Sequence, residues 1–387
     1  MRISTRTRVV SVGLLVLFAW WLHRRLADPP PGEQGEVVPA DEDRYSAAII
    51  NSAVDLIEGA QKAGDVHHRD VHAKAHGCVK ARVEVGEVAP AFRHGVFAEP
   101  RSYDAWIRFS SGDTHQQPDK VRDARGFAMK LMGVPGEKLL EEEKNEQTQD
   151  LIMINSRVFF IPTVREYGIF MRYMSDGSRY GYFFGGPSLH ADRWRLRELL
   201  LALKTLKGAP RSPLDAQYHS LSAYKLGPDL NVKYSAKPCA LPGGKGGAKS
   251  GDDFLREALK SDLAAGNGCF DLLVQPQVAG KNMPVEDATI EWREKDSPFV
   301  KVARVVIPRQ AFDTPEQNAF CEDLSFTPWH ALPAHRPLGG MNRLRKAVYR
   351  EISRYRHSKN RPSSPTRREP RGFCLDLTGQ PCPDAAP

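Results

Sequence analysis

Short runs of alternating apolar and polar residues, separated by turn residues, limit most strongly how this chain can fold. A period of two places successive side chains on opposite faces of the backbone, so each such run predicts a β-strand. The clearest runs read VKARVEV, DAWIRFSS, GFAMKLMG, LNVKYSA, CFDLLVQPQV and KVARVVIP, and we expect further strands in DLIMINSRVFFIP, SLSAYKL and ATIEWRE.

Helical spacing of apolar residues occurs apart from these runs. It is seen in residues 43–64 and 192–208, and a last helix is expected over 343–357, which reads RLRKAVYREISRYRH. Several strands with helices set apart from them predict an α+β fold with an antiparallel sheet, which can close into a barrel.

The two ends of the chain differ from this body. Three arginines precede the apolar run of residues 9–22 and two follow it, without a small-residue cleavage site. This predicts an uncleaved membrane anchor over residues 1–25, with the body on the extracytoplasmic (periplasmic) side. Residues 26–43 form an expected linker, residues 44–360 the domain, and residues 361–387 a Pro/Arg-rich tail that we expect to be disordered.

Charge and cysteine content identify no site by themselves. The chain has 387 residues and a formal net charge of +8, much of it at the two ends, where the basic segments lack the interleaved aromatic residues of a nucleic-acid site. Six cysteines show no CxxC spacing, so no zinc site is predicted. Cys374 and Cys382 either form a small disulfide loop or remain free thiols.

Polar residues inside the strand region suggest a site. In residues 104–111, Trp106, Arg108 and Ser110 share one strand face, and Ile107 and Phe109 share the other. Taken alone, this pattern is typical of a strand whose polar side faces water. A lone histidine such as His72 is likewise more often a structural residue than a catalyst.

Several motifs nevertheless occur in a fixed order. They are R-x-V-H-A-K at 69–74, R-F-S at 108–110, V-R-D-A-R-G-F-A at 121–128, D-L-I-x-x-N-x-x-V-F-F at 150–160, and R-x-x-x-Y at 345–349. In these motifs the chain resembles the catalase family. The phrases FTPWHALPAHRPLGG and DATIEWRE are similar to those of its small, minimal members, and the resemblance covers about residues 66–357.

The resemblance implies a b-type haem, with its iron, in an antiparallel β-barrel surrounded by helices. It also implies roles for individual residues. His72 is similar to the distal acid/base histidine, Ser110 to the residue that orients it, and Val71 to the residue that narrows the approach to the iron. Tyr349 matches the proximal iron ligand with Arg345 as its partner, and Arg69, Arg108 and Arg356 match the arginines that pair with the haem propionates.

The chemistry and the spacing agree with these roles. Heterolytic cleavage of a peroxide needs a base for one oxygen and an acid for the other, and a neutral imidazole can serve as both in turn. A tyrosine needs a nearby cation and the iron itself to ionise at neutral pH. In a helix Arg345 and Tyr349 are neighbours, and Arg356 lies two turns beyond Tyr349 on the same face, whereas Tyr355 does not share this face.

One position departs from the family. The distal asparagine aligns with Ile154, and the asparagine here is Asn155. Either a bulge moves Asn155 inward to act in catalysis, or the second distal hydrogen bond is missing. Tyr167 occupies the position of an aromatic residue that stacks over the haem.

The expected function is therefore the cleavage of hydrogen peroxide or organic hydroperoxides by a haem-dependent oxidoreductase. Two alternatives remain open at this point: rearrangement or peroxygenation of lipid hydroperoxides beside the membrane, and a catalase-like fold that only binds haem. The chain lacks the arm and the C-terminal domain of large catalases, so we expect no nicotinamide cofactor and an oligomer smaller than theirs, such as a homodimer.

Overall fold

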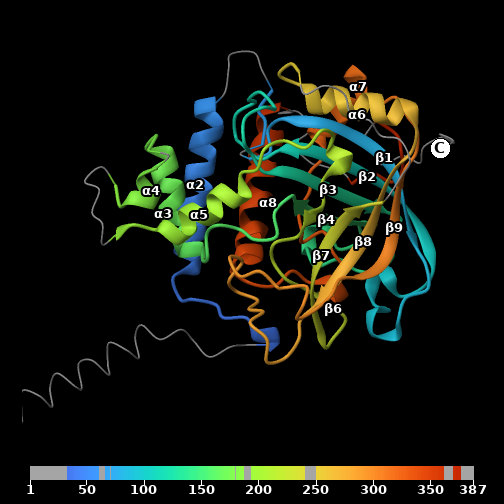
Figure 1. The fold of residues 1–387 in the computed structure, drawn as a ribbon, viewed down its shortest axis with the longest axis horizontal. Coiled ribbons are helices and arrows are strands. Elements are labelled where there is room, and N and C mark those ends of the chain that lie inside the picture. The colour runs from blue at the N-terminus through green and yellow to red at the C-terminus, as the bar shows by residue number, and fades with distance from the viewer. Residues whose placement is uncertain are drawn as a thin grey trace, which may run out of the picture.

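A closed ring of eight antiparallel strands forms the centre of the molecule (Figure 1). The structure, a computed structural model, describes residues 33–60, 66–69, 71–178, 180–186, 193–239, 250–360 and 369–375. Around the ring the order is β5-β4-β3-β2-β1-β9-β8-β7, and the pairing of β5 with β7 closes it. This confirms the predicted α+β fold with an antiparallel barrel. The strands are β1 (Ala75–Val85), β2 (Arg101–Ser111), β3 (Arg125–Met132), β4 (Thr148–Ile154), β5 (Tyr218–His219), β6 (Tyr224–Leu226), β7 (Leu230–Pro238), β8 (Gly268–Pro276) and β9 (Val300–Ile307).

Apolar side chains fill the inside of the barrel. The ring centroid of Phe127 lies 5.4 Å from that of Phe109 and 5.3 Å from that of Phe270. All three side chains are buried, and burial of a large apolar side chain stabilises a fold by roughly 1.5–3 kcal/mol. Because the interior is filled, a ligand site has to lie outside the barrel, where Trp106, Arg108 and Ser110 point.

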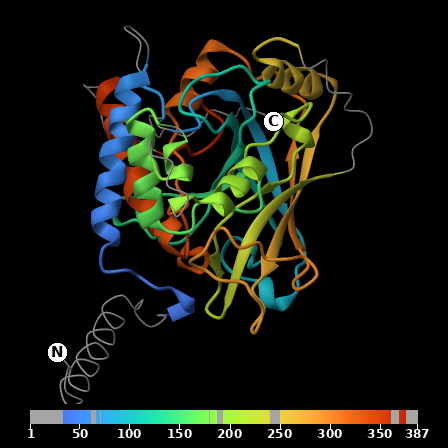
Figure 2. The same ribbon diagram turned by 60° about the vertical axis from the view of Figure 1, so that its left-hand side comes forward.

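Helices cover one side of the barrel. In Figures 1 and 2, α2, α3 and α8 lie side by side there. The buried residues of α2 recur at positions 49, 53 and 57, and they pack in one cluster with Leu344, Val348 and Ile352 of α8. The helices are α2 (Glu42–Ala60), α3 (Val164–Ser175), α4 (Gly181–Phe184), α5 (Leu196–Thr205), α6 (Phe254–Ala265), α7 (Pro315–Asp323) and α8 (Gly340–Asn360). Short 3-10 turns lie at Glu33–Gly35, Pro90–Phe92, Gly95–Phe97, Glu141–Glu143, Pro213–Asp215 and Pro333–His335.

Some predicted elements were wrong. The segment ATIEWRE is not a strand, because its polar groups bond locally: the amide and hydroxyl of Thr289 both donate to Asp287. The runs DLIMINSRVFFIP and SLSAYKL are only partly extended, as β4 and β6. The sequence interpretation also missed α3, α4, α6 and α7.

The chain segment before α2 packs against the domain. Glu36 and Glu42 both pair with Arg343 of α8, at 3.0 Å and 2.7 Å, and Glu286 pairs with the same guanidinium at 2.9 Å. Arg343 therefore belongs to a network of ion pairs. The carboxylates of Glu42 and Glu286 outweigh the effect of its burial and raise its pKa well above the usual range.

The predicted anchor, residues 1–25, lies outside the described residues. Within the described ranges no helix combines the length and the apolar character that a membrane span requires. Of the tail 361–387, the structure describes residues 369–375. There the indole Nε1 of Trp106 donates to Gly372 O at 3.2 Å, and the ring of Phe373 packs edge-on against the same indole.

The cysteines pair in a way that their sequence spacing did not indicate. Cys239 and Cys269 form a disulfide between the end of β7 and the start of β8, with their Cα atoms 5.4 Å apart. Cys78 and Cys321 are free and buried. The predicted Cys374–Cys382 pair involves Cys382, which lies outside the described residues.

Candidate functional site

A cavity lies between the outer face of the barrel and α8. Its barrel side is formed by the segment before β1 and by β2, β3 and β4, and its opposite side by α8. The lining includes Arg69, Val71, His72, Arg108, Ser110, Gly126, Ile152, Phe326, Tyr349, Ile352, Ser353 and Arg356.

His72 and Ser110 form a pair in the barrel wall of this cavity. The imidazole Nδ1 lies 3.0 Å from Ser110 Oγ, which leaves Nε2 for a ligand. His72 has a φ of 61°, a left-handed conformation that few non-glycine residues adopt and that is concentrated at functional sites. At Gly126, a Cβ atom would lie 2.5 Å from Ser110 Oγ and 2.6 Å from His72 Nδ1. Only glycine therefore leaves room for this pair.

The His72 side chain is neutral in its surroundings. It lines the cavity and is partly accessible from it, but protein atoms enclose it closely. Burial lowers the pKa of His72 to about 3, and the positive charges of Arg108, Arg345 and Arg69 act in the same direction. A neutral imidazole can accept a proton from a bound ligand, as general base catalysis requires.

Helix α8 brings Tyr349 to the opposite wall. Tyr349, Ile352, Ser353 and Arg356 follow one another at helical spacing and all line the cavity. Tyr355 is not among the residues that line the cavity in the described part of the chain; like Tyr349, it contacts the apolar cluster between α8 and α2. The face that the sequence assigns to Tyr349 and Arg356 is thus the face that meets the cavity.

Arg345 lies one turn before Tyr349 and is held by a buried polar pair. Its Nη1 lies 3.5 Å from Ser222 Oγ and 3.4 Å from Asn342 Oδ1, and the Ser222 hydroxyl donates to the same Asn342 oxygen at 2.9 Å. Arg345 is also close to the buried phenol of Tyr224. Burial raises the pKa of Tyr224 to about 12, and the charge of Arg345 opposes this rise.

Three arginines meet at one end of the cavity. Arg69 pairs with Glu322 at 3.0 Å, and Arg69 and Arg356 both donate to backbone carbonyls of residues 322–324. Arg108 donates to His72 O at 2.8 Å, and its buried Nε has no hydrogen-bond partner in the described part of the chain. Arginines gathered in this way fit a ligand that carries carboxylates.

Glu322 is a site residue that the sequence interpretation missed. Burial alone would raise the pKa of its carboxyl, but Arg69, His68, Arg108 and Arg356 outweigh burial and hold the pKa well below its usual range. The carboxylate shows that this cluster already stabilises an anion. Only its position shortly before FTPWHALPAHRPLGG could have drawn attention to it.

Three of the predicted site residues, Arg345, Asn155 and Tyr167, are not among those that line the cavity. The Asn155 side-chain oxygen accepts from the backbone amide of Arg125 at 2.7 Å, and the backbone amide of Asn155 donates to Arg125 O at 2.9 Å. The register between β3 and β4 runs without a bulge up to Ile154. Tyr167 packs against Phe159 and Phe170 in the helical layer.

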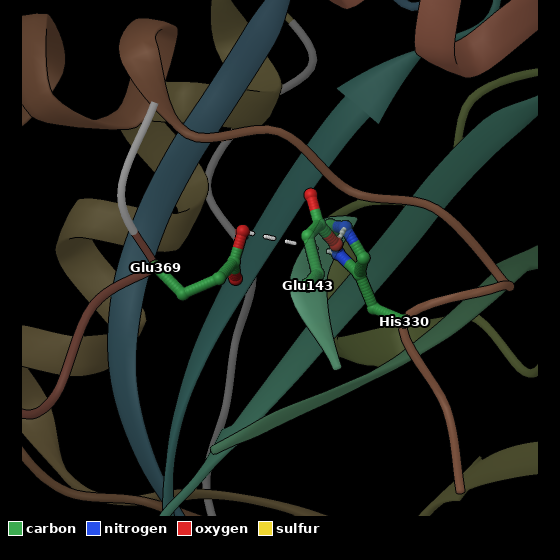
Figure 3. A group of neighbouring side chains, drawn as sticks. All are labelled: Glu143, His330 and Glu369. Atoms are coloured by element: carbon green, nitrogen blue, oxygen red, sulfur yellow. Dashed lines mark ion pairs between the residues drawn. The ribbon is translucent and has the colours of Figure 1, made fainter. Parts of the chain in front are cut away.

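A buried cluster of charged side chains lies beside the cavity. Lys130 on β3 and Asp150 on β4 are register partners. They lie two residues along their strands from Ala128 and Ile152, a pair of register partners that line the cavity. Figure 3 shows Glu143, His330 and Glu369 facing one another, with ligating atoms within 4.8 Å. The Lys130 amine lies 2.7 Å from Asp150 and 2.5 Å from Glu369, and His330 Nδ1 lies 2.9 Å from Asp150. Lys130 thus supplies positive charge inside a buried ion-pair network.

Comparison with solved structures shows that the chain has the fold of catalases. A fungal catalase superposes with a TM-score of 0.60 at 19% identity, over 88% of this chain and 67% of that one. A bacterial catalase gives a TM-score of 0.58 at 19% identity, over 93% and 70%. Catalase A from Saccharomyces cerevisiae gives a TM-score of 0.58 at 18% identity, over 86% and 67%. No family model matches the sequence, and a search of curated proteins finds no significant match.

Proposed function

We propose that this chain, which has the fold of catalases, binds haem in the cavity beside α8 and cleaves peroxides there. The observation that carries the proposal is the arrangement of three kinds of group around one cavity. A neutral histidine lies on one wall, a tyrosine with a nearby arginine on the other, and an arginine cluster at one end.

The residues fit haem as a cofactor. Arg69, Arg108 and Arg356 would bind its two carboxylates, since they already stabilise the carboxylate of Glu322. Tyr349 would bind the iron through its phenolate oxygen, with Arg345 supplying positive charge one turn away. When bound, the ferric haem would supply the centre at which the oxygen–oxygen bond breaks.

His72 would move the proton. Its free Nε2 would accept a proton from one peroxide oxygen and donate it to the departing oxygen. Ser110 would keep the ring in place through its 3.0 Å contact with Nδ1. The low pKa of His72 keeps the base in its neutral form throughout the neutral pH range.

The proposal is tested with Tyr349→Phe and the matched variant Tyr355→Phe on the same helix. We expect Tyr349→Phe to lose the Soret band or most of its haem, because the phenolate oxygen is gone. Tyr355→Phe should keep the wild-type spectrum, because Tyr355 is not among the described residues that line the cavity. Normal haem content and an unchanged spectrum in Tyr349→Phe would overturn the assignment of the ligand.

Organic hydroperoxides are a second candidate substrate class. The observation that favours them is the hydrogen bonding of Asn155 to Arg125, which leaves His72, paired with Ser110, to move the proton without a second distal amide. A slower reaction with a bulkier peroxide would follow. Turnover of hydrogen peroxide and of a fatty-acid hydroperoxide, measured on the same haem-loaded sample, separates the two.

We also propose that the domain works on the extracytoplasmic side of a membrane. The Cys239–Cys269 disulfide supports this, because structural disulfides persist mainly in oxidising compartments. A protease added to intact cells with a permeabilised outer layer should then digest the domain. Full protection until the inner membrane is lysed would contradict the proposal.

A further inference from the structure

Two free thiols lie behind the arginine end of the cavity. Cys78 on β1 is the register partner of Arg108 on β2. Cys321 lies on α7, and both cysteines belong to one buried cluster with Trp106 and Phe320. Neither thiol is in a disulfide, although the chain forms one between Cys239 and Cys269.

A hydrogen bond from α7 fixes the two thiols against each other. The Gln317 side chain donates to Cys78 O at 2.7 Å, and Gln317 lies one turn before Cys321 on the same face of α7. The two cysteine side chains belong to the same buried cluster and influence each other's ionisation. They therefore lie close together across the contact between β1 and α7.

The surroundings make the two thiols chemically unequal. Burial alone would raise the pKa of Cys321, but the Cys78 hydrogen bond and the charges of Arg108 and Arg69 lower it below the ordinary value. Burial and the adjacent Cys321 raise the pKa of Cys78. Arg69 also donates to Cys321 O at 3.4 Å, and both arginines line the cavity, so the buried thiols lie directly behind its arginine end. Positive charge favours the thiolate, which is the nucleophilic form of a cysteine, and we assign this role to Cys321.

We propose that Cys78 and Cys321 are a dithiol site that a hydroperoxide oxidises to a disulfide linking β1 to α7. The Cys321 thiolate attacks one peroxide oxygen, the oxygen–oxygen bond breaks, and a sulfenic acid forms while the other oxygen takes a proton and leaves as water or an alcohol. The Cys78 sulfur then attacks the sulfenic sulfur, its proton joins the departing hydroxide, and water leaves. Two thiols are oxidised and one hydroperoxide is reduced.

This reaction goes beyond the proposed haem chemistry and does not depend on it. The test uses the full-length chain, mildly reduced, freed of reductant and treated with a small excess of hydrogen peroxide. Remaining thiols are alkylated in denaturant, and the protein is digested without reduction for mass spectrometry. We expect a Cys78–Cys321 linked peptide and the loss of two alkylated thiols per chain. The Tyr349→Phe variant should give the same result, so failure of haem binding and failure of the dithiol remain distinguishable.

Two matched variants assign the order of attack. In Cys78→Ser, a dimedone-type reagent should trap a sulfenic acid on Cys321, because the resolving thiol is gone. In Cys321→Ser, Cys78 should remain a thiol and give no adduct. Full alkylation of both cysteines after peroxide treatment in wild type and in Tyr349→Phe would overturn the proposal, as would a dimedone adduct on Cys78 in Cys321→Ser.

Discussion

The imidazole Nδ1 of His72 lies 3.0 Å from the hydroxyl oxygen of Ser110, in the wall of the cavity that α8 closes. If this pair moves the proton, His72→Gln should lower peroxide turnover by about 10²–10⁴-fold. Ser110→Ala should have a smaller effect, about tenfold, because the base remains but its ring loses its orienting contact. Both are measured as peroxide consumption per bound haem.

The chain contains a matched control for this pair. His76 Nε2 lies 3.0 Å from Ser111 Oγ, and these buried residues are not among those that line the cavity in the described part of the chain. Ser111→Ala should therefore lower the melting temperature while turnover per haem stays near that of wild type. Equal losses of turnover in Ser110→Ala and Ser111→Ala would show that the effect of Ser110 is structural.

Substitution of Asn155 separates a role in catalysis from a role in the fold. Asn155→Ala removes the acceptor for the buried Arg125 amide and should cost about 1–3 kcal/mol in the free energy of unfolding. Turnover by the folded, haem-loaded variant should change less than tenfold. The measurements are denaturant unfolding and turnover on the same sample. A loss of more than about 100-fold at normal stability would instead place Asn155 in the chemistry.

The carboxylate of Glu322 should matter more in the haem-free protein than in the loaded one. Glu322→Gln leaves the Arg69 guanidinium without its partner, which should cost roughly 3 kcal/mol in the free energy of unfolding. Haem carboxylates would restore negative charge near the arginines, so Glu322→Gln should lower the free energy of unfolding by less in the haem-loaded protein. Denaturant unfolding with and without haem tests this. Glu291→Gln, which removes an exposed partner of Arg157, should cost less than about 1 kcal/mol in both states.

Acid should destabilise the domain over a defined pH range. Burial lowers the pKa of His72, His219 and His335 to about 3, whereas an unfolded histidine has a pKa of about 6.5. Between these values the unfolded chain binds more protons, so the free energy of unfolding rises with pH, by up to about 1.4 kcal/mol per pH unit for each histidine.

Melting temperatures between pH 4 and pH 8 test this dependence. His335→Gln removes one of the buried titrating groups, so the slope below about pH 6.5 should become shallower. The same change at His115, whose side chain is mostly exposed, should leave the slope unaltered. If wild type, His335→Gln and His115→Gln all showed the same slope of melting temperature against pH, His335 would not be held neutral in the folded state.

Alternation along the strands was enough to predict an antiparallel sheet, and the family resemblance implied that the sheet closes into a barrel. The period of two in DAWIRFSS placed Ile107 and Phe109 inside and Trp106, Arg108 and Ser110 outside, as observed. The segment ATIEWRE shows where such patterns fail. Its alternation resembles a strand, but the side chain of Asp287 competes successfully for the backbone of Thr289.

Motifs and helical spacing predicted part of the cavity lining, although the motif residue Asn155 lies away from it. His72, Ser110 and Tyr349 meet around one cavity from three separate segments, and helical geometry alone places Tyr349 and Arg356 on one face. The place of Glu322 among the arginines could not be read from the sequence, because that pairing depends on how α7 packs. The disulfide was missed for the same reason: Cys239 and Cys269 meet only because β7 and β8 are neighbours.

The ion pairs of Arg343 set the boundary of the folding unit. Glu36 and Glu42 precede or begin α2, yet they neutralise a guanidinium on the helix that carries Tyr349. A version of the protein shortened to start at residue 44 would leave that charge with only Glu286, at a cost of roughly 3 kcal/mol or more. The shortest version that keeps α8 in place should therefore begin before Glu36, which makes the segment ahead of α2 a part of the domain in energetic terms.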